Sequence, residues 1–181
     1  MGTLTIINES GVEPITINEA KDALRILHND EDDRVSGLIT ASRRFAELYC
    51  GIHIINTVVE LSLNNWYSNS IDLNTWPLQS VDSIKYDDTG SPSVELTLTP
   101  NIDYYADVIT QGGKVTVIHS WPPVAQKPNP IRIRMTAGYT DNSTVPENIK
   151  EAIKAYCIYL YDSDPDLEKS AKSILWPERV L

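Results

Sequence analysis

Apolar residues recur at helical spacing in two consecutive stretches between Pro14 and Gly51, which predicts an αα-hairpin. Thr16 followed by Glu19 matches a capping box at the start of the first helix. Each helix then carries one apolar stripe. The stripes consist of Ile17, Ala20, Leu24 and Leu27 in the first helix, and Val35, Leu38, Ile39, Ser42, Phe45, Ala46 and Tyr49 in the second.

An acidic run, residues 30–33, separates the two helices. Asp30 or Asp32 can cap the second helix, and all four carboxylates favour its positive N-terminal end. Gly51 stands where a helix commonly ends in a left-handed residue. Three charged residues of the second helix are expected to face away from the apolar stripe: Arg43, Arg44 and Glu47.

After Gly51 the period of the apolar pattern changes from helical to two, which is typical of strands with one buried face. A rigid connector with four prolines, residues 121–130, interrupts the series. A hairpin is expected across Gln111, Gly112 and Gly113. The expected strands are residues 54–63, 71–73, 81–86, 94–98, 104–109, 114–119 and 131–137, with a further short strand at 3–9.

Helical spacing returns after Pro146, a residue well suited to the first position of a helix. A short fourth helix is expected over residues 167–175, and residues 176–181 form a tail with an apolar tip. The stripe of the third helix consists of Ile149, Ala152, Ile153, Tyr156, Cys157 and Leu160.

The segregation of helices and strands along the chain predicts an α+β fold. We expect a small helical bundle, made of the two N-terminal helices and one or two C-terminal helices, with an inserted antiparallel β-lobe. The whole chain, residues 1–181, is taken as one domain. Its helical body comprises residues 1–51 and 141–175, its β-lobe residues 52–140, and its tail residues 176–181.

Charge and cysteine content narrow the range of possible functions. A net charge of −10 argues against non-specific binding to DNA or to anionic lipid. Cys50 and Cys157 are expected to be buried free thiols. We expect no signal peptide, because the N-terminal residues lack a basic region followed by an apolar run, and no apolar stretch is long enough to span a membrane, so we expect the chain to be cytosolic where it is made.

No pattern for catalysis, for a cofactor or for a metal is found. The chain lacks a glycine-rich phosphate loop and the common nucleophile and zinc motifs. His28, His53 and His119 have no ligand spacing. Consecutive carboxylates in the run 30–33 point in different directions, so helix capping is the better interpretation. A hydrolase with an unrecognised carboxylate pair is the least favoured hypothesis.

Aromatic residues near turns are the remaining candidates for binding. Trp66, Tyr67, Trp76 and Trp121 can form a surface for sugar or peptide, or belong to the core or to a subunit interface, since tryptophan and tyrosine are common in all three. Trp176 and the apolar tip of the tail are hard to bury in their own domain, which indicates a groove on a partner.

Five stretches in order resemble the head–tail connector (adaptor, head-completion) proteins of tailed phages. They read ITINEAKDALRI, LITASRRFAELYCG, IINTVVELSLN, WPLQSVDSIKY with a following DxxG turn, and IRIRMTAGYTDNSTVPENIKEAIKAYCIYLYD. The likeness covers nearly the whole chain, and the order and spacing of the motifs are its most specific feature.

The resemblance implies a structural virion protein without catalytic activity or cofactor. Such adaptors form a ring, commonly of twelve subunits, that joins the capsid portal to the tail or stopper protein and extends the DNA channel at the head–tail interface. A tail-associated module that binds sugar or peptide is the alternative. The implied portal-binding residues are Ile174, Leu175, Trp176, Pro177, Arg179, Val180 and Leu181, and the candidate subunit-interface residues are Trp66, Tyr67 and Trp121.

Overall fold

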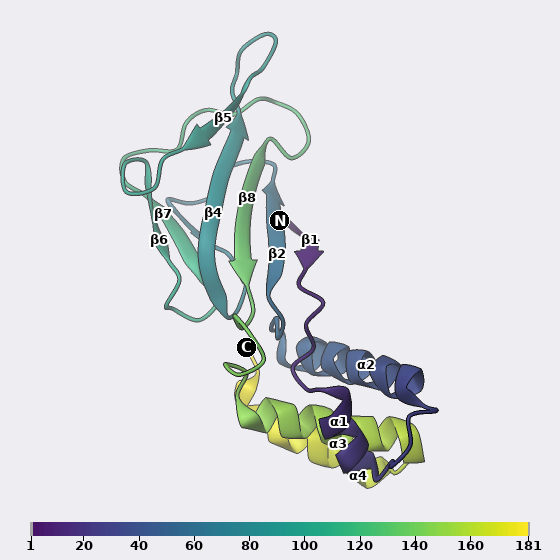
Figure 1. Cartoon of the computed structure of the whole chain (residues 1–181). Coiled ribbons are helices and arrows are strands. Elements are labelled where there is room, and N and C mark those ends of the chain that lie inside the picture. The colour runs from purple at the N-terminus through teal and green to yellow at the C-terminus, as the bar shows by residue number, and fades with distance from the viewer. Residues whose placement is uncertain (1, 181) are drawn as a thin grey trace. The chain divides into compact units, whose positions relative to one another are not determined.

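The computed structural model describes residues 2–180, which divide into two compact units (Figure 1). A sheet unit comprises residues 2–10 and 56–138. A helical unit comprises residues 11–55 and 139–180. Helices and antiparallel strands are therefore segregated, which confirms the predicted α+β class.

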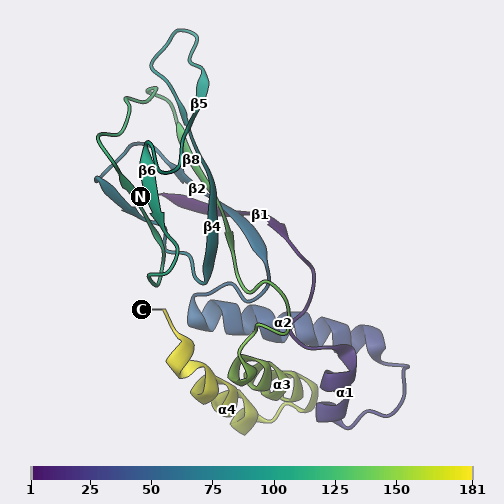
Figure 2. The ribbon, with the colours of Figure 1, turned by 60° about the vertical axis from the view of Figure 1, so that its left-hand side comes forward.

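The helical unit contains four α-helices: α1 (Ile17–Leu24), α2 (Asp32–Cys50), α3 (Glu147–Asp162) and α4 (Pro165–Leu175). A short 3₁₀ helix, η1 (Trp176–Glu178), follows α4 directly. α3 contacts each of the other three helices, and Figure 2 shows it between α1 and α4. The α3 stripe is confirmed at its centre, where Ile149, Ile153 and Cys157 are fully buried.

The capping box of α1 is confirmed. Thr16 Oγ1 accepts from the Glu19 amide at 3.2 Å, and Glu19 Oε2 accepts from the Thr16 amide at 2.6 Å. The helix ends earlier than expected, because Arg25 adopts a left-handed conformation with φ 59°. The chain therefore turns before Leu27, which is 98% exposed, and Ile26 enters the core in its place. The expectation that Leu27 extends the apolar stripe was wrong.

The start of α2 also differs from the expectation. Its N-cap is Glu31, which makes no side-chain capping bond, and the side chains of Asp30 and Asp32 do not cap it. Asp32 instead accepts from Lys21 Nζ at 2.8 Å, which ties α2 to α1. The end of the helix is as expected, since Gly51 is left-handed with φ 71°.

Two charged residues of α2 lie inside the helical unit, where the sequence pattern had placed them on other faces. Arg43 and Glu47 are both buried. Arg43 donates to Glu47 Oε2 at 2.8 Å and to Glu13 Oε2 at 2.8 Å, and Glu47 Oε1 accepts from the Ile54 amide at 2.9 Å. A protein core can hold a buried ion pair when further hydrogen bonds to its members offset the cost of desolvation. These bonds tie α2 to the segments that precede α1 and follow α2.

The sheet unit consists of two antiparallel sheets, one of five strands in the order β1-β2-β8-β4-β5 and one of three in the order β3-β7-β6 (Figure 1). The strands are β1 (Thr3–Glu9), β2 (Thr57–Leu63), β3 (Ser70–Asp72), β4 (Leu78–Asp87), β5 (Glu95–Leu98), β6 (Tyr104–Asp107), β7 (Lys114–Val117) and β8 (Ile131–Ala137).

The core of this unit lies between the two sheets. Alternate residues of β2 and β8 are buried, as the period of two predicted. They meet residues of the smaller sheet and its surroundings, so the two sheets form a sandwich. The core cluster consists of Val59, Leu61, Leu63, Ile71, Leu73, Leu78, Ile84, Leu98, Tyr104, Val115, Ile131, Ile133 and Met135.

The expected strand at residues 3–9 is present as β1, but its place differs from the grouping of residues 1–51 as helical body. β1 pairs with β2, with Leu4 opposite Leu61 and Ile6 opposite Val59. The described residues before Ser10 therefore belong to the sheet unit. The physical reason is that an isolated strand cannot satisfy its own backbone groups, whereas β2 offers a ladder.

We predict that Arg43→Met destabilises the helical unit by about 3–5 kcal/mol, because it removes the buried cation with which both Glu13 and Glu47 pair. Urea denaturation followed by circular dichroism measures the change. Arg44→Met on the next position of the same helix is the matched control. The Arg44 side chain is half exposed and lies 3.8 Å from Glu47, so its loss should cost less than about 1 kcal/mol. Equal losses in the two variants would contradict the assignment.

Candidate docking surface at the C-terminal segment

The C-terminal segment, residues 174–180, runs from the last turn of α4 through η1. Leu175 is buried in the helical unit, where its carbonyl lies 3.7 Å from Cys50 Sγ. The next residue, Trp176, is 63% exposed. The chain thus places one large apolar side chain inside and the following one outside.

Two further bonds hold this segment against the helical unit. The Val180 amide donates to the Cys50 carbonyl at 2.8 Å, at the end of α2. Asn148 Nδ2, from the first turn of α3, donates to Glu178 Oε1 at 2.7 Å. The described part of the tail is therefore attached to its own unit. It presents Trp176 from a fixed backbone.

Arg179 lies close to two aromatic rings. Its guanidinium carbon is 4.9 Å from the Trp176 ring centroid and 5.3 Å from that of Tyr49, both within the range of cation–π attraction. Its Nε is buried and has no hydrogen-bond partner among residues 2–180. A buried donor without an acceptor costs free energy, and because this nitrogen is enclosed by its own unit the cost belongs to the fold and is not a contact that a partner can complete.

An open hollow of about 420 Å³ adjoins this stack and is lined by Tyr49, Lys169, Lys172, Ser173 and Trp176. Both lysines pair with carboxylates of their own helix, Lys169 with Asp166 and Lys172 with Glu168. The aromatic centre and the charged rim resemble the composition of protein interfaces. We call these five residues together with Arg179 the C-terminal surface.

The residues expected to bind the portal have different positions in the fold. Leu175 is part of the core and cannot reach a partner. Ile174, Arg179 and Val180 are half-buried, and Trp176 and Pro177 are exposed. Leu181 lies outside the described residues. Tyr49 belongs to the surface and was missed, because the sequence places it on the apolar stripe of α2.

The tryptophans proposed for the subunit interface contact each other. The Trp66 and Trp121 rings stack with centroids 4.3 Å apart. Trp66 Nε1 donates to the Pro122 carbonyl at 2.9 Å, and Trp121 Nε1 donates to the Ser68 carbonyl at 2.7 Å. The pair therefore fastens the proline-rich connector to the loop after β2. One face of each ring is used in the stack, which disfavours a sugar platform, while Tyr67 remains exposed.

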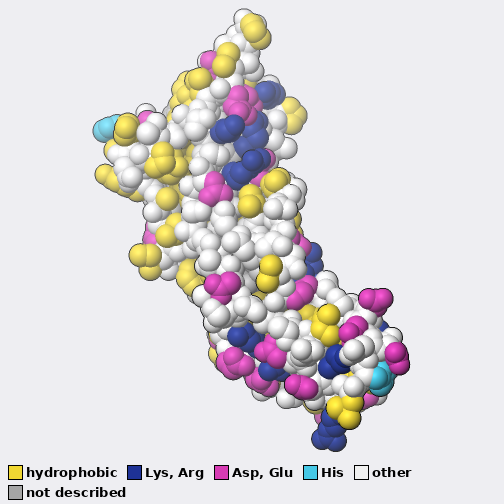
Figure 3. Space-filling model, in the orientation of Figure 1, with side chains coloured by type: hydrophobic (Ala, Val, Ile, Leu, Met, Phe, Trp, Pro, Cys, Tyr) yellow, Lys and Arg dark blue, Asp and Glu magenta, His cyan; other side chains and the backbone are white. Residues whose placement is uncertain are grey.

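Lysine and arginine side chains gather on one face of the sheet unit, with carboxylates among them (Figure 3). Arg132 pairs with Asp87 at 2.9 Å and with Glu95 at 2.7 Å. The hydrogen bond from Arg132, and after it the one from Lys127, lowers the pKa of the Asp87 carboxyl. Because Lys85 and Arg134 also pair with Glu95 and Glu60, this face is electrically compensated and is a poor phosphate-binding surface.

The two thiols are buried, as expected. Burial raises the pKa of Cys50 and of Cys157 to about 11. Thiols are nucleophilic as thiolates, so neither is activated at neutral pH. Within residues 2–180, no group of three or more histidine, cysteine or acidic side chains is arranged to hold a metal ion. No helix in the same range has the length and apolar character needed to cross a membrane.

Comparison with known proteins gives a family and a fold. The model of a family described as head completion protein matches residues 13–173. The fold is similar to a chain in the neck of an empty gene transfer agent particle computed with C6 symmetry, with TM-score 0.82, 16% identity, and 99% of this chain and 96% of that chain covered. No curated protein sequence matches the chain.

Two further solved structures share the fold at 16% identity, with 99% of this chain and 96% of each matched chain covered. One matched chain is in the virion of a native gene transfer agent particle, with TM-score 0.81. The other is in the neck of the native particle computed with C12 symmetry, with TM-score 0.79. At this identity the likeness concerns the fold, which agrees with the α+β arrangement described above.

We predict that neither thiol reacts with a thiol-specific chromogenic reagent in the folded protein at pH 8. Raising a thiol pKa from 9.0 to about 11 lowers the thiolate fraction about a hundredfold, and burial also blocks the reagent. The same protein in guanidinium chloride is the control and should release two equivalents of chromophore. Rapid reaction of either cysteine in the folded protein would contradict this description.

Proposed function

Because the chain belongs to the head completion protein family, we propose that it is a structural adaptor subunit of a phage-like particle, which joins the capsid portal to the tail or stopper protein. The family match covers most of the chain and carries the general assignment to a structural head protein. The observation that carries the portal-binding role is the C-terminal surface, where Trp176 is exposed on a segment that is otherwise fastened to its unit.

A closed ring is the assembly that we propose. Chains of similar fold occur in particle necks computed with C6 and C12 symmetry, which supports a ring of identical subunits around an axis. We propose twelve subunits, a number that is compatible with both the C12 and the C6 symmetry of those necks. A ring at the head–tail interface would surround the path of the DNA.

The charge distribution supports DNA passage without capture. The chain has a net charge of −10, and the cations on the sheet face are paired with carboxylates. A protein holds the phosphate backbone by releasing counterions through unpaired lysine and arginine side chains. The proposed channel would therefore let DNA slide, whichever face of the ring surrounds it.

The chemistry of the C-terminal surface indicates what the portal should offer. Trp176 and Tyr49 call for an apolar groove, because large aromatic side chains dominate the binding energy of interfaces. The lysines at the rim of the hollow, Lys169 and Lys172, call for carbonyl or carboxylate oxygens at the edge of that groove. A helical portal segment with an apolar stripe flanked by acidic residues would meet both requirements.

A non-catalytic role is the one that the residues support best. The protonated thiols and the family of head completion proteins both favour a structural protein. The stacked tryptophans make the sugar-binding alternative weaker, since the pair is occupied in fastening two loops.

We predict that Trp176→Ala weakens binding to the portal by at least about thirtyfold, the effect of losing one interface hot spot worth about 2 kcal/mol. Because Trp176 is largely exposed, the melting temperature should change little. Biolayer interferometry with immobilised portal measures the affinity. Leu27→Ala is the matched control, since Leu27 is also an exposed large apolar residue of the helical unit but lies away from the C-terminal surface. Unchanged affinity of the Trp176 variant would remove the proposed binding site.

A further inference from the structure

The five-stranded sheet ends in two different free edges. β1 pairs with β2 on one side only, and β5 pairs with β4 on one side only. Within the described residues, neither edge is covered by another strand of its sheet. An edge strand presents unpaired amide and carbonyl groups, which form a template for a strand from another chain.

The apolar residues on both edges lie on the same face of this sheet. Leu4 and Ile6 of β1 are opposite Leu61 and Val59 of β2, which are core residues that face the smaller sheet. At the other edge, Leu96 of β5 is opposite Tyr86, next to the core pair Leu98 and Ile84. Cross-strand partners share a face. Leu4, Ile6 and Leu96 are therefore continuations of the core face.

These three side chains are exposed because the three-stranded sheet does not cover them. Leu4 is 41% exposed, Ile6 46% and Leu96 41%. Natural edges are usually protected by lysine, proline or inward-pointing charge. β1 has no lysine or proline, and its protective features, the register shift between Ile6 and Asn8 and the charge of Glu9, come after Ile6, so Thr3 to Ile6 form its unprotected part. In β5, the charge of Glu95 is engaged by Lys85 and Arg132.

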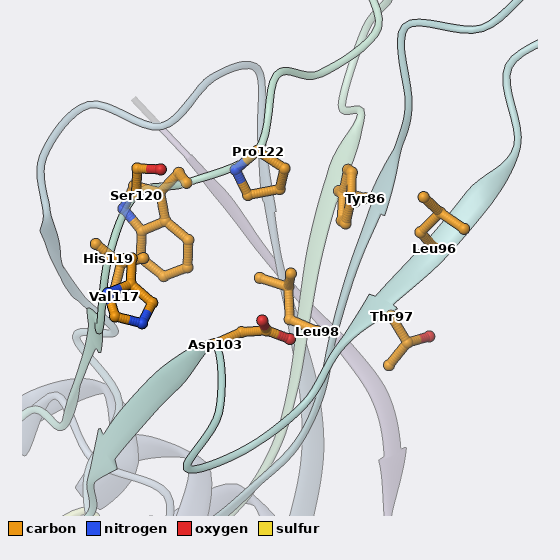
Figure 4. A pocket seen from close by; sticks show the side chains of 10 residues that line it. Tyr86, Leu96, Thr97, Leu98, Asp103, Val117, His119, Ser120 and Pro122 are labelled. Carbon is orange, nitrogen blue, oxygen red and sulfur yellow. The ribbon is translucent and has the colours of Figure 1, made fainter.

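A pocket of about 380 Å³ opens beside the β5 edge (Figure 4). Its apolar lining includes Leu96, Leu98, Tyr86, Trp121 and Pro122. Figure 4 shows the β5 residues across from Pro122 and His119, which lie on the segment after β7. A strand added at β5 would direct alternate side chains into this space, which is the usual way in which an added strand is recognised.

We propose that β1 of one copy adds to β5 of the next copy, and that Leu4 and Ile6 fill the pocket beside β5. The proposal rests on the ring of the proposed function, and it names the surface by which the ring closes. The interface is heterologous, since one copy contributes β1 and the other β5. Heterologous contacts generate rings when the rotation between copies closes, so each copy uses both edges and no edge remains free.

A second copy is favoured over other occupants for two reasons. The two edges are complementary, because β1 supplies apolar side chains on the core face and β5 supplies a pocket on that face. Chains of similar fold occur in necks computed with C6 and C12 symmetry, and both symmetries place identical copies next to each other. The proposal also places Trp121, a candidate interface residue from the sequence, in the wall of the pocket.

Two single variants test the pairing by mixing. Ile6→Lys disables the β1 edge and leaves β5 intact, and Leu96→Lys does the reverse. Native mass spectrometry and mass photometry over a concentration series would measure the assembled species of the full chain. The wild-type chain is expected to form higher oligomers, and each variant alone is expected to remain monomeric. An equimolar mixture of the two variants should stop at a heterodimer, because only one intact β1–β5 contact is available.

Ile109→Lys is the matched control, since Ile109 is 86% exposed in the same unit, outside both edges, and this variant should assemble like the wild type. Melting temperatures within about 2 °C of the wild type show that the edge variants fold, as expected for exposed sites. A wild-type chain that stays monomeric, an edge variant that still forms higher oligomers, or a mixture without heterodimer would overturn the edge pairing.

The same variants separate this inference from the proposed function. Portal binding depends on the C-terminal surface, so Ile6→Lys and Leu96→Lys should each still bind a portal fragment as monomers. Normal assembly of Trp176→Ala together with lost portal binding would support both proposals. If the edge variants assemble while Trp176→Ala loses the portal, only the edge pairing fails.

Discussion

The larger sheet has more apolar inner face than the smaller sheet can cover, and this mismatch determines which surfaces of the sheet unit remain for partners. The larger sheet has five strands and the smaller sheet has three. The central strands β2 and β8 bury their alternate residues, whereas Leu4, Ile6 and Leu96 remain exposed at the two ends. Exposed apolar residues that continue a core face indicate a surface completed by another chain. In the proposed ring, these are the residues that a neighbouring copy would cover.

The interior of the helical unit, in contrast, contains a buried ion pair whose members also have further hydrogen bonds. Arg43 is buried between Glu13 and Glu47, and Glu47 in turn accepts from the Ile54 amide. These bonds hold the segments on both sides of the hairpin against α2, which ends at the left-handed Gly51. The C-terminal segment is fastened to that end through Val180 and Cys50. The position of Trp176 thus depends on the same helix that the buried ion pair orients.

Local signals predicted most of the elements. The capping box at Thr16, the left-handed Gly51 and the alternation in β2 act over a few residues, and each is present as expected. The errors arose where a distant partner outweighed the local pattern. Arg43 and Glu47 read as surface residues because the pattern along one helix does not include Glu13, thirty positions away. For Trp66 and Trp121, 55 positions apart in the sequence, the local pattern left surface, core and interface open, and only the fold showed that the two rings stack.

The sequence by itself determined the α+β class, the acidic character and the family resemblance, because these depend on composition, on periodicity and on the order of motifs. Only the tertiary structure decided which apolar residues remain exposed. Leu175 and Trp176 are neighbours in an equally apolar segment, yet one is a core residue and the other faces solvent. The physical reason is that burial depends on which elements pack over a residue, and that packing joins segments far apart in the chain.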